Sequence, residues 1–245
     1  MTNREFYLQK AAMYDLLSMY FKYSDPRLHI HYYQKHLKYM QKGVHSMRDH
    51  QQERPAQVRV LHAVPDAPNV DIYVNGNLVL SDIAFKDITG FMPLPAGKYH
   101  IDIYPAGTSV STVISKKVTV EAGNIYTLAA VGQGNKLQLL PYVTDPFVPH
   151  GETKVRFIHL SPDAPAVDIA VAKGDVIFPK VSFKQATDYL GLTPMTVNLE
   201  VRAAGTKDAV LSVPNVSLQP NQSYTIFAVG LLNDSPELDA LLVMG

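Results

Sequence analysis

The hydrophobic positions follow two different periods along the chain, which divides it into a helical start and a β-rich remainder. Over residues 1–50 apolar side chains recur every three or four positions, as on one face of a helix. The segment Ser24-Asp25-Pro26 interrupts this pattern, and proline suits the first turn of a second helix. The pattern therefore predicts an antiparallel helical hairpin over residues 1–50.

The apolar stripe of this hairpin is the expected interaction face. Its second half has spacings of three and four residues in alternation, like the seam of a coiled coil. Two helices alone bury too little surface to be stable, so we expect the hairpin to dock on a protein partner or to self-associate. Its tyrosines suit an interface, and packing between the two helices explains them equally well. The expected face comprises Phe6, Met13, Leu16, Tyr20, Tyr23, Ile30, Tyr33, Leu37, Met40, Val44 and Met47.

After a polar linker at 51–56, the period changes to two. Alternating segments such as "KYHIDIY" and turn signals such as "VNGN" are typical of half-buried strands and tight hairpins. The fold class is therefore predicted to be mainly β, with two tandem Ig-like or Greek-key sandwiches at 57–143 and 154–245, joined by a proline-containing linker at 144–153. In the first sandwich we expect strands near 57–63, 69–75, 77–82, 98–104, 113–120, 124–132 and 136–142.

The two predicted sandwiches share a repeated stretch. "VRVLHAVPDAPNVDIYV" runs from Val58 to Val74, and "VRFIHLSPDAPAVDIAV" runs from Val155 to Val171. One residue is inserted soon after the second copy, at "AKGD", and the two sequences stay aligned beyond it. This alignment indicates an internal duplication of one fold.

In the repeated stretch, the prolines stiffen a turn between two strands, and an aspartate can accept backbone N–H bonds. If the strands pair as a hairpin centred on Pro65, Arg59 lies opposite Asp71 on an exposed outer face, and Arg59→Ala is expected to cost less stability than Asp66→Ala. If the strands belong to different sheets, Asp71 caps backbone groups instead. The structural motif comprises Arg59, His62, Pro65, Asp66, Pro68, Asp71, Arg156, His159, Pro162, Asp163, Pro165 and Asp168.

The same motif offers a metal or ligand site as the alternative interpretation. Calcium takes six to eight oxygen ligands, and each copy supplies only two carboxylates. The stretch holds no glycine-flanked serine, metalloprotease helix or phosphate loop, so we expect no catalytic residues and no cofactor. A structural role for the histidines is favoured over a ligand role. The metal candidates are His62, Asp66, Asp71, His159, Asp163 and Asp168.

The pattern V-R-x-x-H-x-x-P-D-A-P-x-V-D-I-x-V, with "YTLAAVG" and "YTIFAVG" further along each copy, resembles the bacterial family called domain of unknown function 4397. The resemblance covers about residues 57–245 and implies β-sandwich domains, often in tandem and common in surface or envelope proteins. It transfers no catalytic residues. The hairpin resembles N-terminal segments of proteins from Gram-positive spore-forming bacteria.

Composition and charge narrow the function further. The 245 residues include no cysteine, which excludes disulfides and thiol chemistry, and the net charge is zero. Residues 1–56 carry a net charge of +4, which is weak for nucleic-acid binding. Without a recognisable signal peptide or transmembrane run, the expected location is cytoplasmic, and the alternative is association with the spore. We expect a non-enzymatic structural, assembly or surface-display protein; the alternative is a module that binds a glycan or envelope polymer.

Overall fold

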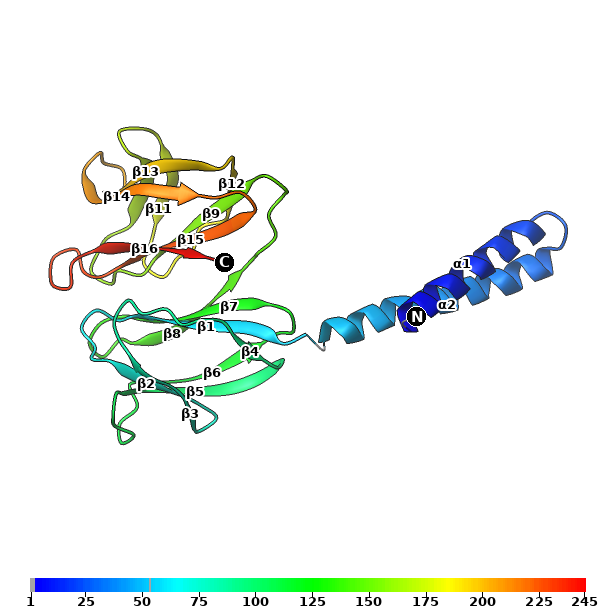
Figure 1. The fold of residues 1–245 in the computed structure, drawn as a ribbon, viewed down its shortest axis with the longest axis horizontal. Helices are drawn as coiled ribbons and strands as arrows, with labels where there is room; N and C mark the ends of the chain where they lie inside the picture. The colour runs from blue at the N-terminus through cyan, green and yellow to red at the C-terminus, as the bar shows by residue number, and fades with distance from the viewer. Residues whose placement is uncertain (1–2, 53) are drawn as a thin grey trace. The chain divides into compact units, whose positions relative to one another are not determined.

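The computed structural model describes residues 3–52 and 54–245, with side-chain surroundings for 5–44 and 54–245. The fold is mainly β with two N-terminal helices, and its four sheets form two tandem sandwiches (Figure 1). The fold class predicted from the sequence is thereby confirmed. The contact pattern divides the chain into the helical hairpin and a body that contains both sandwiches, and each is described by itself.

The hairpin consists of α1 (Asn3–Phe21) and α2 (Pro26–Gln52). Asp25 begins the second helix as its N-cap, because its Oδ1 accepts the backbone N–H groups of Arg27 and Leu28 at 3.0 and 3.2 Å. The contacts between the helices are largely aromatic. Tyr14 stacks on Tyr32 and Tyr39, with ring centroids 6.3 and 5.4 Å apart.

Two histidines of α2 tie it to backbone carbonyls of α1. The Nδ1 atom of His29 lies 2.9 Å from the carbonyl oxygen of Ser18, and that of His36 lies 3.1 Å from the carbonyl of Ala11. The hairpin therefore closes on a seam of aromatic rings and imidazoles, in which Tyr14, Tyr32 and Tyr39 pack between the helices.

The expected interaction face is not this seam. Its ten members within the described side chains are all exposed, from 38% for Met13 to 89% for Tyr23, and Met47 lies outside the described side chains. On α2 the exposed members from Ile30 to Met40 each come one residue after a histidine or tyrosine of the seam. One residue corresponds to a rotation of about 100° around the helix axis, so these members point away from the seam. The hairpin thus leaves its apolar stripe uncovered by its own helices.

Within the described residues, the first sandwich, called repeat 1, is built from eight strands. They are β1 (Ala56–Ala63), β2 (Val70–Val74), β3 (Asn77–Ile83), β4 (Met92–Leu94), β5 (Gly97–Pro105), β6 (Ile114–Val120), β7 (Ile125–Val131) and β8 (Gln138–Thr144). One sheet has the order β4-β1-β7-β8 and the other β3-β2-β5-β6.

The second sandwich, called repeat 2, has the same arrangement. Its strands are β9 (Thr153–His159), β10 (Val167–Val171), β11 (Val176–Val181), β12 (Leu190–Leu192), β13 (Met195–Ala203), β14 (Ala209–Leu218), β15 (Gln222–Val229) and β16 (Asp239–Met244). They form the sheets β12-β9-β15-β16 and β11-β10-β13-β14. The matching strand orders confirm that one fold was duplicated.

Two expectations about the strands are wrong. The strand β4 was not expected, because it is only three residues long and therefore too short to show an alternating pattern. The pairing of β1 with β2 as a hairpin is also wrong, because the two strands lie in different sheets. In the structure β1 pairs in parallel with β7, so that Val58 lies opposite Tyr126, and β2 pairs with β3 and β5.

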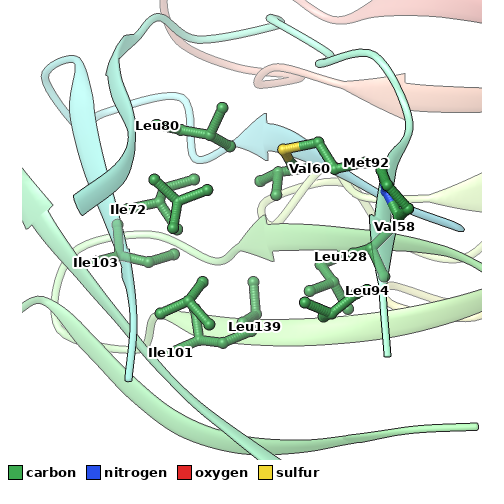
Figure 2. A pocket seen from close by; sticks show the side chains of 13 residues that line it. Val58, Val60, Ile72, Leu80, Met92, Leu94, Ile101, Ile103, Leu128 and Leu139 are labelled. Carbon is green, nitrogen blue, oxygen red and sulfur yellow. The ribbon is translucent and has the colours of Figure 1, made fainter. Parts of the chain in front are cut away.

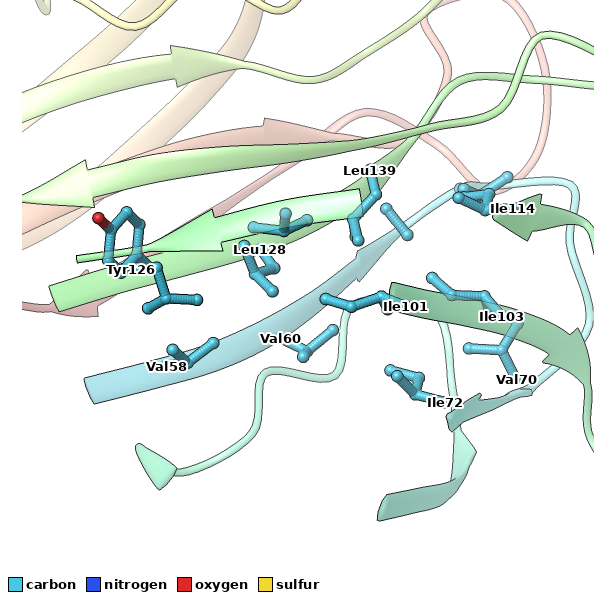
Figure 3. Packing of buried hydrophobic residues seen from close by; sticks show 14 of the residues in the cluster. Val58, Val60, Val70, Ile72, Ile101, Ile103, Ile114, Tyr126, Leu128 and Leu139 are labelled. Atoms are coloured by element: carbon cyan, nitrogen blue, oxygen red, sulfur yellow. The ribbon is translucent and has the colours of Figure 1, made fainter. Parts of the chain in front are cut away.

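Each sandwich has its own hydrophobic core between its two sheets. In repeat 1 the core includes Val58, Val60, Ile72, Ile101 and Leu128, which project inward from both sheets (Figure 3). The corresponding core of repeat 2 is built around Phe157, Ile169, Leu199 and Ile226.

A third cluster joins the repeats through the outward faces of β1 and β9. Leu61 and Val131 of repeat 1 pack with Ile158, Leu160 and Phe227 of repeat 2, and all five are at most 2% exposed. The sheets β4-β1-β7-β8 and β12-β9-β15-β16 are therefore covered on both sides. This explains why β1 and β9 are buried at nearly every position.

Candidate functional site

The repeated arginines lie in the contact between the two sandwiches. Arg59 is 5% exposed and Arg156 is 6% exposed, which contradicts the expected position on an exposed outer face. Neither meets the aspartate expected as its partner, because β1 and β2, like β9 and β10, belong to different sheets. The face of β1 that carries Arg59 points away from the core of repeat 1, and repeat 2 covers it.

The two arginines make reciprocal hydrogen bonds across this contact. Nη1 of Arg59 donates to the carbonyl oxygen of Met244 in repeat 2, and Nη1 of Arg156 donates to the carbonyl of Val143 in repeat 1, both at 2.7 Å. Val143 and Met244 are equivalent positions, because each lies opposite the tyrosine of its repeat's "YT" pair. The interface is thus self-complementary, as in a twofold-symmetric dimer, although both halves belong to one chain.

Threonines on the neighbouring strands hold each guanidinium in place. Nε of Arg59 donates to Oγ1 of Thr127 at 2.9 Å, and Nε of Arg156 donates to Oγ1 of Thr225 at 3.1 Å. Both threonines have no exposed surface. Sequence reasoning missed their role, although their recurrence after Tyr126 and Tyr224 was a usable signal.

Aromatic rings complete the surroundings of the two cations. The Cζ atom of Arg59 lies 4.4 Å from the ring centroid of Phe91, and that of Arg156 lies 4.7 Å from the ring of Tyr189. Burial lowers the pKa of Arg59 to about 10, with Tyr189 acting in the opposite direction and Arg156 lowering it further. Arg59 therefore remains a buried cation at neutral pH.

The Nη2 atoms of the two arginines differ in their hydrogen bonding. Nη2 of Arg156 lies 3.4 Å from Oγ1 of Thr144, whereas Nη2 of Arg59 has no hydrogen-bond partner among the described residues. The position in repeat 2 that corresponds to Thr144 is occupied by Gly245, which has no hydroxyl group. The arginine of repeat 2 is therefore the better satisfied of the pair.

Asp71 and Asp168 cap backbone groups within their own sandwiches, as expected if the flanking strands belong to different sheets. The carboxylate of Asp71 accepts the N–H groups of Asp82 and Gly107, both at 2.9 Å. Asp82 has a positive φ of 57°, at an irregularity in the pairing of β2 with β3. The aspartate thus supports a strained bulge on one side and a turn on the other.

Asp168 repeats this arrangement in the second sandwich. Its oxygens accept the N–H groups of Lys180 at 2.7 Å and Gly205 at 2.8 Å. These two bonds are the main reason why the pKa of Asp168 lies below its ordinary value.

His62 and His159 hold the proline-containing turns. In repeat 1, Nε2 of His62 lies 3.2 Å from the carbonyl of Pro68, and Nδ1 accepts the N–H of Val64 at 3.3 Å. His159 makes the same two contacts with Pro165 and Ser161. Burial lowers the pKa of both imidazoles, although the prolyl carbonyls act in the opposite direction. The neutral tautomer, with its proton on Nε2, satisfies both contacts.

The aspartates of the turns bind the loop that follows the central strand. Asp66 accepts the N–H of Gly134 at 2.8 Å, and Asp163 accepts the N–H groups of Leu232 and Asn233 at 2.8 and 2.9 Å. The expected bonds from backbone N–H groups thus come from a loop about 70 residues away. Asp163 also accepts a bond from the hydroxyl of Ser161 within its own turn, at 3.2 Å. Each turn is therefore fixed at both ends.

The metal candidates do not converge on one point. His62 and Asp71 use their polar atoms on backbone groups, and Asp66 points to a different loop. Among the described residues, no group of three or more His, Asp or Glu side chains could hold a metal ion. No described helix is long and apolar enough to cross a membrane.

Two further contacts between the repeats were not foreseen from the sequence. Nζ of Lys86 forms an ion pair with Oδ2 of Asp239 at 2.7 Å, and the hydroxyl of Tyr142 donates to the carbonyl of Lys184 at 2.9 Å. Unlike the arginine bonds, they have no counterparts at the repeat-equivalent positions, where Gln138 and Val243 stand in place of Asp239 and Tyr142.

Fold and site together define a tandem β-sandwich protein whose two repeats are joined through reciprocal buried arginines. The family profile described as "Domain of unknown function (DUF4397)" matches residues 56–170 and 170–243. The chain belongs to this family, which the repeated stretch had indicated. Among curated proteins, no sequence matches the chain.

Several solved structures show limited similarity. The C-terminal domain of AlgF from P. aeruginosa has 20% identity and a TM-score of 0.31, and the match covers 39% of this chain and 99% of that one. The Bacillus anthracis TIE protein has 12% identity and a TM-score of 0.25, with 72% of this chain and 34% of that one covered. A putative cell adhesion protein from Bacteroides ovatus has 12% identity and a TM-score of 0.22, with 78% and 96% covered.

Proposed function

We propose that this protein is a non-enzymatic assembly protein in which the hairpin mediates self-association and the two sandwiches form a rigid contact body. The observation that carries the proposal is the uncovered apolar stripe of the hairpin. The polar side chains of the repeated motif support it, because their hydrogen bonds are spent on the fold itself. The family resemblance is the basis for placing such an assembly at the cell envelope, and the resemblance of the hairpin is the basis for a spore-associated role.

The stripe on α2 has the spacing of a helix-to-helix contact. Ile30, Tyr33, Leu37, Met40 and Val44 alternate steps of three and four residues, and each is between 38% and 55% exposed. Side chains with this spacing form one continuous row along a helix and fit the same row on a second helix. Contiguous apolar surface of this kind usually marks an interaction site.

The charges on α2 favour a second copy of the chain as the occupant. Its lysines do not lie in the stripe: Nζ of Lys35 is 5.2 Å from the ring of Tyr14, and Nζ of Lys42 is 5.5 Å from the ring of Tyr39. The residues that flank the stripe at positions 34 and 41 are uncharged glutamines. Two copies can therefore pair along this row without bringing like charges together.

Light scattering of the full chain with a charge-inserting variant tests the proposal. We expect a concentration-dependent dimer or larger assembly, and we expect Leu37→Glu to weaken it at least tenfold, because a carboxylate would be desolvated in the seam. Lys38→Glu is the matched control, since it changes the adjacent exposed position but lies outside the stripe. A native chain that stays monomeric at about 100 µM, where a dimer of micromolar affinity would be almost fully formed, overturns self-association. Equal effects of the two variants overturn the stripe as its site.

A further inference from the structure

Both sandwiches enclose an apolar cavity at the same place between their sheets. The cavity of repeat 1 has a volume of about 150 Å³, and that of repeat 2 about 280 Å³. Figure 2 shows the repeat 1 cavity, with side chains such as Ile72, Leu80, Met92, Leu128 and Leu139 placed around it. Packed interiors rarely leave a void larger than a water molecule, so two voids of this size call for an explanation.

The lining is apolar in both repeats and comes from equivalent positions. Val60, Leu80 and Ile101 of repeat 1 correspond to Phe157, Phe178 and Leu199 of repeat 2, and all six line their cavities. No charged or hydrogen-bonding side chain contributes to either lining. The cavity is therefore a feature of the duplicated fold and not a local packing fault.

One substitution favours the larger cavity in repeat 2, although Phe157 and Phe178 are bulkier than Val60 and Leu80. Tyr99 packs against the core of repeat 1, and the equivalent residue of repeat 2 is Val197, which lines the larger cavity. A valine leaves space that a tyrosine ring would fill, and Met195 on the same strand also lines the larger cavity. The two repeats thus contain apolar cavities of the same kind that differ in volume.

Exposed lining residues locate the opening of each cavity. Val79 on β3 lines the first cavity and is 46% exposed, while Val171 and Met195 line the second and are 36% and 41% exposed. On the opposite edge of the sandwich, β6 contacts β8, and β14 likewise contacts β16. Each cavity is thus a slot with partly exposed apolar side chains at its rim.

Such a slot disfavours water and favours hydrocarbon. A buried water needs two to four polar partners, which these side chains do not supply, and an aliphatic cavity of roughly 150 Å³ is large enough to stay dry and bind benzene-sized guests. Methionine at the rim, Met92 in one repeat and Met195 in the other, adapts its shape to different guests. A guest with a polar end can leave that end at the solvent-facing side.

We propose that each sandwich binds an unbranched alkyl chain in this slot, with the polar end of the ligand in water. The alkyl chain of a lipid or of a small amphiphile supplies this chemistry. The slot between two sheets accepts a narrow flexible chain, and its lining contributes no group that recognises a head group. Repeat 2 is expected to take the longer chain because its cavity is the larger.

The test is a titration of the full chain with 1-octanol, followed by methyl NMR and calorimetry. We expect two sites, with shifts confined to lining methyl groups such as those of Ile72, Ile101, Ile169 and Leu199. The matched ligand is 1,8-octanediol, which has the same length but would bury a second hydroxyl group without a partner. It should bind at least tenfold more weakly, because an unsatisfied hydroxyl group is costly in a dry cavity.

Variants that exchange residues between the repeats identify the sites. Val60→Phe introduces the residue that repeat 2 carries, and Val197→Tyr introduces the one that repeat 1 carries, so both are compatible with the fold. Each native repeat carries only one of these two bulky residues, Tyr99 in repeat 1 and Phe157 in repeat 2. Each variant adds the second one, so it should weaken 1-octanol binding in its own repeat at least tenfold and leave the other site unchanged. Val110→Phe is the control, because Val110 is 95% exposed and lies outside both cavities.

Three results overturn the proposal. They are no lining shifts at saturating 1-octanol, equal affinity for 1-octanol and 1,8-octanediol, and binding that survives in the double variant Val60→Phe/Val197→Tyr. Binding that survives in the double variant would also reveal 1-octanol bound to the exposed stripe of the hairpin, because the cavity variants leave that stripe unchanged. If one variant fails to fold, the other repeat still supports or overturns the proposal by its own site.

Discussion

Arg59 and Arg156 each find part of their hydrogen-bond partners in the other sandwich. Each donates to a threonine on its own sheet and to a carbonyl of the other repeat. Hydrogen bonds to charged groups are worth about 1.5–3 kcal/mol, more than neutral ones. One bond from each arginine crosses to the other repeat, which makes the pair a main polar link between the sandwiches.

Arg156→Ala is predicted to lower the free energy of unfolding by about 2–4 kcal/mol, because it leaves the carbonyl of Val143 and the hydroxyl of Thr225 without their donor. Asp66→Ala should cost only about 0.5–1 kcal/mol, because its bond to Gly134 is exposed. Arg59 makes the equivalent buried bonds in repeat 1, so Arg59→Ala should also cost more than Asp66→Ala, which reverses the ranking expected from a surface ion pair. Urea denaturation of the purified variants measures each loss.

The control for this comparison is Arg54→Ala, at an exposed position next to β1. It should change the free energy of unfolding by less than about 0.5 kcal/mol. A loss below about 1 kcal/mol for Arg156→Ala would show that the interface holds without its arginines.

At the scale of an element, the proline-containing turn is stabilised from inside by its histidine and from outside by the following loop. His62 and His159 each bridge the two ends of their turn in the neutral form, and each is 1% exposed. Protonation would place a second N–H against the backbone N–H at Nδ1. The turn is therefore coupled to pH.

Acidification is predicted to destabilise the body through these two turns. Burial lowers the folded-state pKa of His62 and His159 below the ordinary value of 6.5. The unfolded chain then binds more protons, so stability is fully present above pH 6.5 and is lost as the pH falls from 6.5 through the folded-state values. Thermal melts at intervals between pH 7.5 and 5, a range about the ordinary histidine pKa, measure this loss.

The double variant His62→Asn/His159→Asn should have a lower melting temperature at pH 7.5, where the native histidines are neutral, and a flatter pH dependence. His100→Gln is the control, because His100 has a 45% exposed side chain that bonds to Ser115 on the surface. If the double variant keeps the full pH dependence of the native chain, the buried histidines are not its source.

For the whole molecule, the third hydrophobic cluster makes the two sandwiches one folding unit. Leu61, Leu160 and Phe227 are fully buried only because the repeats cover one another. Removing that contact would expose these side chains and the two arginines together. We therefore predict a single cooperative unfolding transition for the body in scanning calorimetry.

Phe227→Ala should lower the free energy of unfolding by about 3–5 kcal/mol, through lost burial and the cavity left at the interface. Its weaker interface should also broaden the transition or split it in two. Phe147→Ala is the matched control, since Phe147 is 74% exposed. Two separate transitions in the native protein would contradict the prediction.

Much of this protein was readable from the sequence because the information was local. The switch in hydrophobic period separated the hairpin from the sandwiches, and the repeated stretch revealed the duplication. The turn function of the prolines also followed from backbone geometry, and the preference for structural histidines agrees with the contacts of His62 and His159. These features depend on residues close together in the chain.

The tertiary structure decided which strands are neighbours and what covers their outer faces. Successive side chains of β1 point to opposite faces of its sheet, which places Arg59 on the face away from the core of repeat 1. This alternation cannot distinguish a face exposed to solvent from one covered by another domain. The same limit applies to the hairpin, whose 3–4 spacing marked an apolar row but not its exposure. Contacts between residues some 185 positions apart, such as Arg59 with Met244, arise only when both repeats have folded.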